Sequence, residues 1–85
     1  MEIVYTQKAK EDLAFWKKSG DIQIQKRISL LIISILQNPY EGIGKPEHLK
    51  FNLSGKWSRR ITQEHRLVYG VEEERIIIFS MLHHY

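Results

Sequence analysis

The hydrophobic pattern of this 85-residue chain changes its period once, from a helical repeat in the first half to strand-like alternation in the second. Up to residue 38, apolar side chains recur at the three- and four-residue spacing that is typical of amphipathic helices. From residue 56 onward they form short runs rich in β-branched and aromatic residues, which are typical of strands. This segregated order predicts an α+β fold in which helices cover one face of a sheet.

Two helices are predicted in the first half of the chain. Thr6 is a good N-cap for the first helix, which we expect to run to about Lys18. Asp21 can cap the second helix, and Asn38-Pro39 ends it, because proline disfavours helical geometry in the residue before it. The short Ser19-Gly20 connection makes the pair an antiparallel helix hairpin.

Four strands complete the predicted order β-α-α-β-β-β. They are expected at residues 2–5, 56–62, 65–71 and 75 to about 84. The last three have short connections, so we expect an antiparallel sheet with the helix hairpin packed on one face. The pattern leaves open which face is the core, because the last strand is apolar on both faces. Alternation allows Arg60, Arg66 and His84 to converge on one face of adjacent strands.

Length, composition and charge limit the classes of function. A chain of 85 residues predicts one domain, and the lack of cysteine excludes disulfides and thiolate metal sites. No apolar run approaches the roughly 20 residues of a membrane span, and the N-terminus lacks the order of a signal peptide, so we expect a cytoplasmic protein. The formal net charge is +3, and residues 45–66 contain six cations but only two anions. Such a basic window indicates either a polyanion site or a solvated charged face.

Residues in and after this window can assemble a site that cleaves RNA. Cleavage needs a base for the 2′-hydroxyl, an acid for the leaving 5′-oxygen, and positive charge near the phosphorus. Glu47 can act as the general base, His84 as the general acid, and Arg66 as the donor to the phosphate oxygens. The candidates for substrate contacts are Lys50, Arg60 and Arg59, which bind RNA, and Tyr85, which stacks on a base or orients the phosphate.

Neither a metal nor another cofactor is expected. The histidines and carboxylates lack a familiar ligand spacing, and His83 and His84 would point to opposite faces of a strand. Taken singly, an arginine in a strand or a histidine near a chain end is more often an ordinary surface residue than a functional one. The other conspicuous aromatic residues are expected to pack in the core or in loops: Trp16, Tyr40, Phe51 and Trp57.

The segment NPYEGIGKPEHLKFNLSGKWSRRITQEHRLVYGV, followed by an apolar strand that ends in His-Tyr, closely resembles the YoeB toxins, which belong to the RelE-like mRNA interferases. The resemblance spans most of the chain and implies the microbial ribonuclease-like α+β fold. It implies metal-independent, endonucleolytic cleavage of mRNA in the A site of the 70S ribosome, which inhibits translation. It also implies a YefM-type antitoxin as partner, and a homodimer is a further expectation.

The resemblance assigns roles to individual residues. The family's functional positions fall on Glu47 of GKPE, Lys50 of the following LK, the second arginine of WSRRI at Arg60, Arg66 of EHRLVY, and the pair His84 and Tyr85. Two positions depart from the family, because His83 and Lys56 stand where aromatic residues are common. The departure at His83 leaves open which histidine contributes.

Two rival functions remain open at this stage. A ParE-like toxin of the same fold would inhibit its target without chemistry, and an RNA- or ribosome-binding module would use only the basic window. Neither would need Glu47, Arg66 and His84 together. If the chain is a nuclease, nearby arginines make a carboxylate a weaker base. We therefore expect the free protein to cleave RNA poorly until the ribosome and mRNA complete the site.

Overall fold

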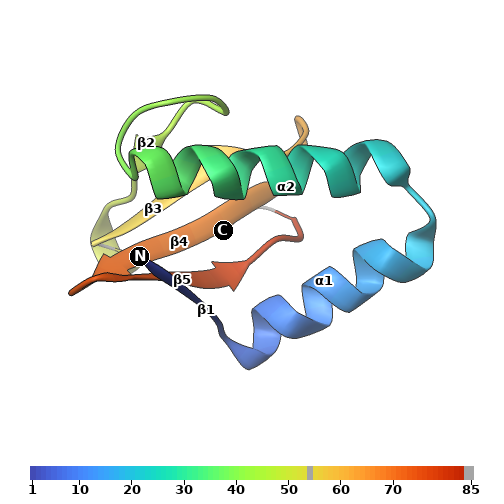
Figure 1. Cartoon of the computed structure of the whole chain (residues 1–85), viewed down its shortest axis with the longest axis horizontal. Helices are drawn as coiled ribbons and strands as arrows, with labels where there is room; N and C mark the ends of the chain where they lie inside the picture. The colour runs from blue at the N-terminus through green and yellow to red at the C-terminus, as the bar shows by residue number, and fades with distance from the viewer. Residues whose placement is uncertain (54, 84–85) are drawn as a thin grey trace.

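The chain forms a strand, a helix hairpin and then a meander, with one short strand that the sequence did not predict (Figure 1). The computed structural model describes residues 1–53 and 55–83. In chain order the elements are β1 (Glu2–Tyr5), α1 (Gln7–Ser19), α2 (Ile22–Gln37), β2 (Glu47–His48), the 3₁₀ helix η1 (Phe51–Leu53), β3 (Lys56–Arg60), β4 (Arg66–Glu72) and β5 (Arg75–Ser80). The predicted α+β architecture is confirmed, and β2 is the addition.

Side chains cap both helices at the residues predicted from the sequence. The Thr6 hydroxyl accepts a hydrogen bond from the Ala9 N–H at 3.1 Å. The Asp21 carboxylate accepts one from the Ile24 N–H, also at 3.1 Å. Between the helices, Gly20 has a φ of 75°, a left-handed conformation that glycine adopts without steric cost. The chain therefore reverses within two residues, and the helices form the predicted hairpin.

The sheet contains a parallel pair among antiparallel neighbours. Its strand order is β1-β5-β4-β3-β2, and β1 runs parallel to β5, with Glu2 opposite Arg75. The other neighbouring strands are antiparallel, as their connections predict. Because two helices separate β1 from the meander, no tight turn forces β1 into the antiparallel direction. The sheet is therefore mixed, whereas an antiparallel sheet was expected.

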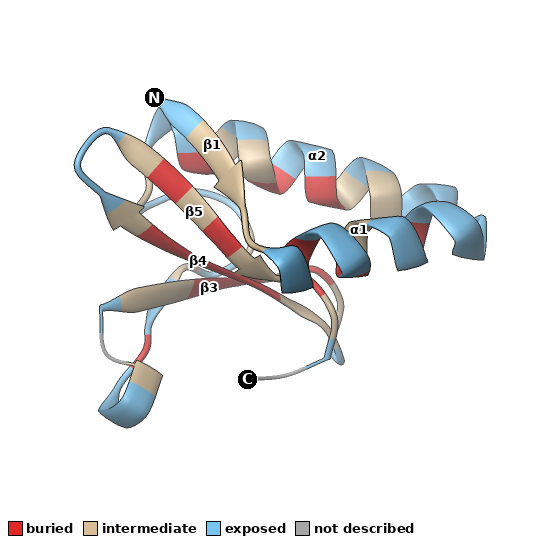
Figure 2. Cartoon of the chain, turned by 90° about the horizontal axis from the view of Figure 1, so that it is seen from below, coloured by how far each residue is buried: buried red, intermediate tan, exposed pale blue. Residues whose placement is uncertain are grey.

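Both helices lie on the same side of the sheet, as Figure 2 shows. Leu31 and Ile35 of α2 are fully buried against the central strands, where Leu67 and Tyr69 of β4 and Ile78 of β5 are also fully buried. These residues identify the core face that the sequence pattern left open. Of the two helices described, neither combines the length and the apolar character that crossing a bilayer would require.

Four strand ends differ from the prediction, one of them only because β4 continues by one residue to Glu72. β3 ends at Arg60, because the Ile61 and Thr62 N–H groups both turn to the His65 carbonyl, at 3.0 and 3.2 Å. β4 accordingly begins at Arg66 instead of residue 65. β5 ends at Ser80, well before residue 84. There the next amide, that of Met81, leaves the ladder and donates to the Asp12 carboxylate of α1 at 2.8 Å.

Arg59 is fully buried, although its neighbour Arg60 is partly exposed. Each of its five N–H groups donates to a neutral oxygen. The acceptors are Tyr69 Oη at 3.1 Å, Ser34 Oγ at 2.7 Å and the carbonyls of Ile43 at 3.1 Å, Asn38 at 2.7 Å and Glu41 at 3.1 Å. An arginine has five donors in a fixed planar fork, so this guanidinium is fully satisfied. It joins β3 to α2 and to the loop at residues 38–43.

The loop closes tightly around this guanidinium. The Tyr69 hydroxyl donates to the Pro39 carbonyl at 2.5 Å, and burial raises the pKa of Tyr69 although the hydrogen bond from Arg59 opposes this shift. Gly42 has a φ of 133°, and a Cβ there would lie 2.8 Å from Arg59 Nη1. Both the backbone conformation and the lack of space therefore require glycine at this position.

The first prediction concerns this buried cation. Replacing Arg59 by lysine keeps the charge but offers fewer donors, so buried oxygens lose their partners. We expect Arg59→Lys to lower the free energy of unfolding by about 2–4 kcal/mol, measured by urea denaturation. The matched control is Arg60→Lys on the same strand, which we expect to change it by about 0.5 kcal/mol or less. Equal losses in the two variants would refute the structural role of Arg59.

Candidate active site

The strands β2, β3 and β4 gather predicted site residues on the face of the sheet that the helices leave uncovered. In the observed register, Arg60 lies directly opposite Arg66, and Glu47 lies opposite Ser58. Directly opposed residues share a face, and so do alternate residues of one strand. Arg60, Arg66 and Glu47 therefore point to the same side. Arg59 and Leu67, which pair with each other, point to the helix side.

A carboxylate and a guanidinium meet on this uncovered face. Arg66 Nη1 donates to Glu47 Oε1 at 3.2 Å, across 19 positions of sequence. The Arg66 side chain is 13% exposed, whereas that of Glu47 is 54% exposed. Glu47 comes from the edge strand β2, so a bound ligand can reach its carboxylate directly. This arrangement supplies both an acceptor for a proton and a fork of donors for an anion.

Lys50 and Arg60 lie around this pair. Lys50 is exposed and lines an open hollow of about 490 Å³ together with Glu47 and the rest of the segment at residues 47–53. The main chain of Arg60 is fixed on both sides: its N–H donates to the Gly44 carbonyl at 2.7 Å, and its carbonyl accepts from Arg27 Nη2 at 3.1 Å. The side chain of Arg60 is partly exposed. Two cations are thus available beside the ion pair.

The structure corrects the expectation for Arg59. A guanidinium that is fully buried, with all its donors used inside the fold, has no face left for a phosphate. Arg59 is therefore a structural residue and not an RNA-binding one.

The aromatic residues that were expected to pack differ in their exposure. Trp16 is buried in the core as expected, whereas Phe51, which was expected to pack, is 92% exposed.

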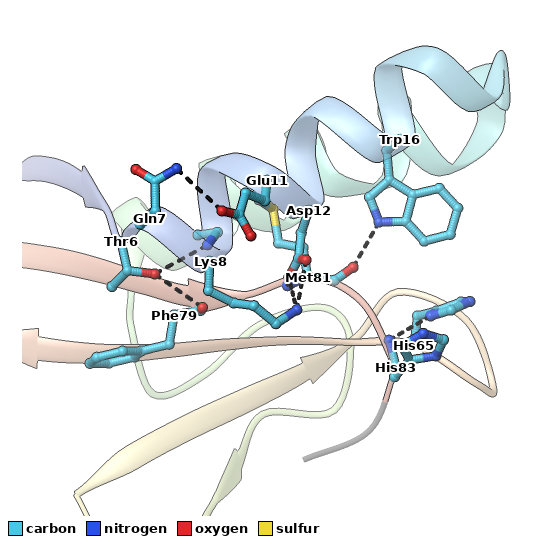
Figure 3. Close-up of polar contacts among 11 residues, drawn as sticks. Thr6, Gln7, Lys8, Glu11, Asp12, Trp16, His65, Phe79, Met81 and His83 are labelled. Atoms are coloured by element: carbon cyan, nitrogen blue, oxygen red, sulfur yellow. Dashed lines mark hydrogen bonds and ion pairs between the residues drawn. The ribbon is translucent and has the colours of Figure 1, made fainter.

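The predicted general acid His84 and its neighbour Tyr85 lie outside the described residues. The last strand was expected to run to about residue 84, and this boundary is wrong, because β5 ends at Ser80. The chain continues instead as an irregular segment at residues 81–83, which we name the C-terminal segment. Figure 3 shows Met81 and His83 of this segment beside α1 and His65. The direction of the chain after β5 is thus set by side chains of other elements.

Hydrogen bonds to α1, to His65 in the β3–β4 turn and to Arg66 of β4 hold the C-terminal segment. The Met81 N–H donates to Asp12 Oδ2 at 2.8 Å, and the Met81 carbonyl accepts from Trp16 Nε1 at 2.7 Å. The His83 N–H donates to His65 Nδ1 at 2.7 Å, and the His83 carbonyl accepts from the Arg66 N–H at 3.1 Å. Arg66 therefore contacts the segment through its main chain and Glu47 through its side chain.

Sequence reasoning missed the residues of this attachment, although one of them carried a signal. Asp12 falls between Ala9 and Trp16 on the apolar face of α1, and it is 3% exposed. A carboxylate at such a position has to find a partner, and Lys8 Nζ supplies one at 2.7 Å. His65 had no comparable signal, because its acceptor role depends on a main-chain amide 18 positions away.

The site's described residues do not include a group of three or more histidines, aspartates and glutamates placed to hold a metal ion. What they offer is a set of charges suited to an anionic substrate. A half-exposed carboxylate beside an arginine fork, with a lysine and a second arginine nearby, matches acid–base work on a phosphodiester.

Comparisons with known proteins agree on one family. A family model described as the YoeB-like toxin of bacterial type II toxin–antitoxin systems matches residues 5–85. The chain is 48% identical to the protein named Toxin YoeB from Synechocystis, covering all of this chain and 98% of that protein. It is 45% identical to Toxin YoeB from Escherichia coli K12 over the full length of both.

Solved structures give the same result. A YoeB/ParE toxin from Agrobacterium tumefaciens superposes with a TM-score of 0.95 at 39% identity, over the whole of both chains. Two structures from Staphylococcus aureus, a heterotetrameric YoeB–YefM toxin–antitoxin complex and a YoeB dimer, give TM-scores of 0.89 and 0.90 at 45% identity, covering all of this chain and 98% of those chains.

The second prediction separates the site from the scaffold. Glu47 is half exposed, so Glu47→Ala should lower the free energy of unfolding by about 1 kcal/mol or less. Asp12→Ala instead leaves the Met81 amide without its acceptor, and we expect a loss of about 1–3 kcal/mol. Urea denaturation of both variants gives the comparison. A larger loss for Glu47→Ala than for Asp12→Ala would mean that Glu47 is mainly a structural residue.

Proposed function

The chain belongs to the YoeB-like toxins of bacterial type II toxin–antitoxin systems, and from this premise we propose that it is a ribosome-dependent mRNA endoribonuclease that inhibits translation in the cytoplasm. The observation that carries the proposal is the contact of 3.2 Å between Glu47 and Arg66 on the uncovered face of the sheet. It joins a proton acceptor to a phosphate-binding group beside the hollow that Lys50 lines. A toxin that only bound its target would not need this pair.

In the proposed reaction, Glu47 removes the proton from the 2′-hydroxyl of the nucleotide on the 5′ side of the cut. The 2′-oxygen attacks the adjacent phosphorus, and Arg66 donates to the non-bridging oxygens as they gain charge. His84 protonates the 5′-oxygen as its bond to phosphorus breaks. The products are a 2′,3′-cyclic phosphate and a 5′-hydroxyl, so protons and bonds balance without a metal.

The remaining residues contact the substrate in this proposal. Lys50 and Arg60 hold the phosphates that flank the cut, where each neutralised phosphate adds affinity that falls with rising salt. Tyr85 stacks on a base or orients the reacting phosphate. Arg59 takes no part, because it is buried.

The proposed dependence on the ribosome is explained by the contact between Glu47 and Arg66. In the free protein, Arg66 Nη1 is engaged by Glu47, so a substrate phosphate must compete with that carboxylate for the guanidinium. A flexible RNA also has to be held with its 2′-oxygen in line with the leaving oxygen, which is entropically costly. We propose that the ribosomal A site holds the mRNA in this geometry and supplies the phosphates that draw Arg66 away from Glu47.

The partner proposed for regulation is a YefM-type antitoxin, and a homodimer is a further proposed state. Support comes from the Staphylococcus aureus relatives, which were solved as a complex with YefM and as a dimer. This chain has apolar side chains that suit such contacts on the outer surface of α2. Ile22, Leu30 and Ile33 are each more than half exposed there.

The third prediction tests the chemistry. In a reconstituted translation reaction, we expect Glu47→Gln and Arg66→Gln to lower mRNA cleavage at least about 100-fold, because each removes a group that acts only at the reacting phosphate. Cleavage is measured by mapping mRNA ends, which should fall inside translated codons and not in untranslated RNA. Ribosome binding should change less than about threefold, since Lys50 and Arg60 remain.

The control is Arg75→Gln, which removes a cation that pairs with Glu72 at the β4–β5 turn, away from the site. It should cleave within about twofold of the native protein, a change that corresponds to less than about 0.5 kcal/mol. If Glu47→Gln and Arg66→Gln still inhibit translation fully, without cuts in the mRNA, the chain acts as a non-catalytic, ParE-like inhibitor or binding module instead.

A further inference from the structure

We infer that His65 is a positioning residue. The Nδ1 atom of its neutral imidazole holds the C-terminal segment beside the main chain of Arg66. The inference rests on the proposed function in one respect, because the segment leads directly into His84, the proposed general acid. The contact itself does not depend on that proposal. The His83 N–H donates to His65 Nδ1 at 2.7 Å, which is a short and direct hydrogen bond.

The hydrogen bond determines which nitrogen of His65 carries the proton. A ring nitrogen that accepts cannot be protonated, so the proton of the neutral ring resides on Nε2. Glu64 Oε1 lies 3.5 Å from Nε2. The ring is also fixed by packing, because it meets the Trp16 indole edge to face at a centroid distance of 4.9 Å. The acceptor nitrogen is therefore aimed at the His83 amide by contacts on its other sides.

The backbone at His83 supports the need for such a fixed contact. His83 has a φ of 63°, a left-handed conformation that is unfavourable for a residue with a side chain. Conformations of this kind persist only where surrounding interactions determine them. Here the N–H of His83 is bound by His65 and its carbonyl by the Arg66 N–H at 3.1 Å. His65 and Arg66, which are consecutive in the chain, thus fix both main-chain groups of His83.

Protonation of His65 would remove this contact. A second proton on the ring converts Nδ1 from an acceptor into a donor, which then faces the donor N–H of His83. The ionisable groups that face the ring are Glu64 from the β3–β4 turn and His83 from the C-terminal segment, whose ring centroid is 5.3 Å away. From α1 the ring meets Trp16, which does not ionise. A substitution that removes the acceptor has the same consequence, because the His83 N–H is then left without its partner.

Two substitutions at His65 separate positioning from packing. His65→Asn keeps a side-chain acceptor close to the place of Nδ1 but cannot titrate, whereas His65→Leu keeps bulk and loses the acceptor. In a ribosome-dependent cleavage assay at pH 8, we expect His65→Leu to lower cleavage at least about tenfold and His65→Asn to stay within about threefold of the native protein. A general loss of packing would affect both variants alike.

Rescue by the conservative variant gives the readout that a purely structural role would not change. The variants His65→Asn and His65→Leu both lose the imidazole, but only His65→Asn keeps an acceptor for the His83 N–H. We expect cleavage by His65→Asn to exceed cleavage by His65→Leu at least about threefold. Equal cleavage by the two variants would overturn the inference. His83→Asn is the matched control, because it keeps both main-chain groups and tolerates the left-handed backbone.

Amide hydrogen exchange tests the contact without the ribosome. On the isolated full-length protein at pH 8, the His83 amide should exchange at least about tenfold faster in His65→Leu than in native protein or His65→Asn. Equal exchange in all three would overturn the inference whatever the cleavage results. If native protein cleaves no mRNA but His83 shows this pattern, the proposed function fails, and the assignment of His65 to the C-terminal segment stands.

Discussion

The buried guanidinium of Arg59 is the interaction on which the candidate site depends. Removing a cation from water is costly, and the fold offsets that cost by giving every donor a neutral oxygen. Three of those acceptors are carbonyls of the loop at residues 38–43, so the same contacts fix the path of the loop. The loop leads through Gly44, whose carbonyl binds the Arg60 N–H, into β2. Glu47 reaches the edge of the sheet because this path is fixed.

Arg66 makes hydrogen bonds to two segments that are distant from it in the sequence. Its side chain contacts Glu47 of β2, and its main-chain N–H contacts His83 of the C-terminal segment. Neither β2 nor this segment has much regular structure of its own, and polar contacts to other elements position both. β2 contacts β3 and β4, whereas the segment contacts α1, the β3–β4 turn and β4. A candidate site built in this way can be accurate without a large core, which suits a chain of 85 residues.

Local signals in the sequence predicted what local contacts determine. The helix caps at Thr6 and Asp21 are formed by side chains and amides a few positions apart, so their pattern is visible in the sequence. Alternation also placed Arg59 correctly on the face opposite Arg60, but nothing in the pattern showed that helices and carbonyls would cover that face. The end of β5 was missed for a similar reason. It is set by Asp12, 69 positions earlier, and by no turn residue near Ser80.

The position of β5 in the sheet has a consequence for synthesis of the chain. Among the described strands β5 is made last, yet it lies between β1 and β4 and pairs with both. A nascent chain that stops short of residue 75 therefore presents two unpaired strand edges, and its hydrophobic core is open. Such a chain also lacks His83, so the hydrogen bond from the Arg66 N–H to the His83 carbonyl cannot form. The contacts that hold the C-terminal segment are thus deferred until the chain has emerged through residue 83.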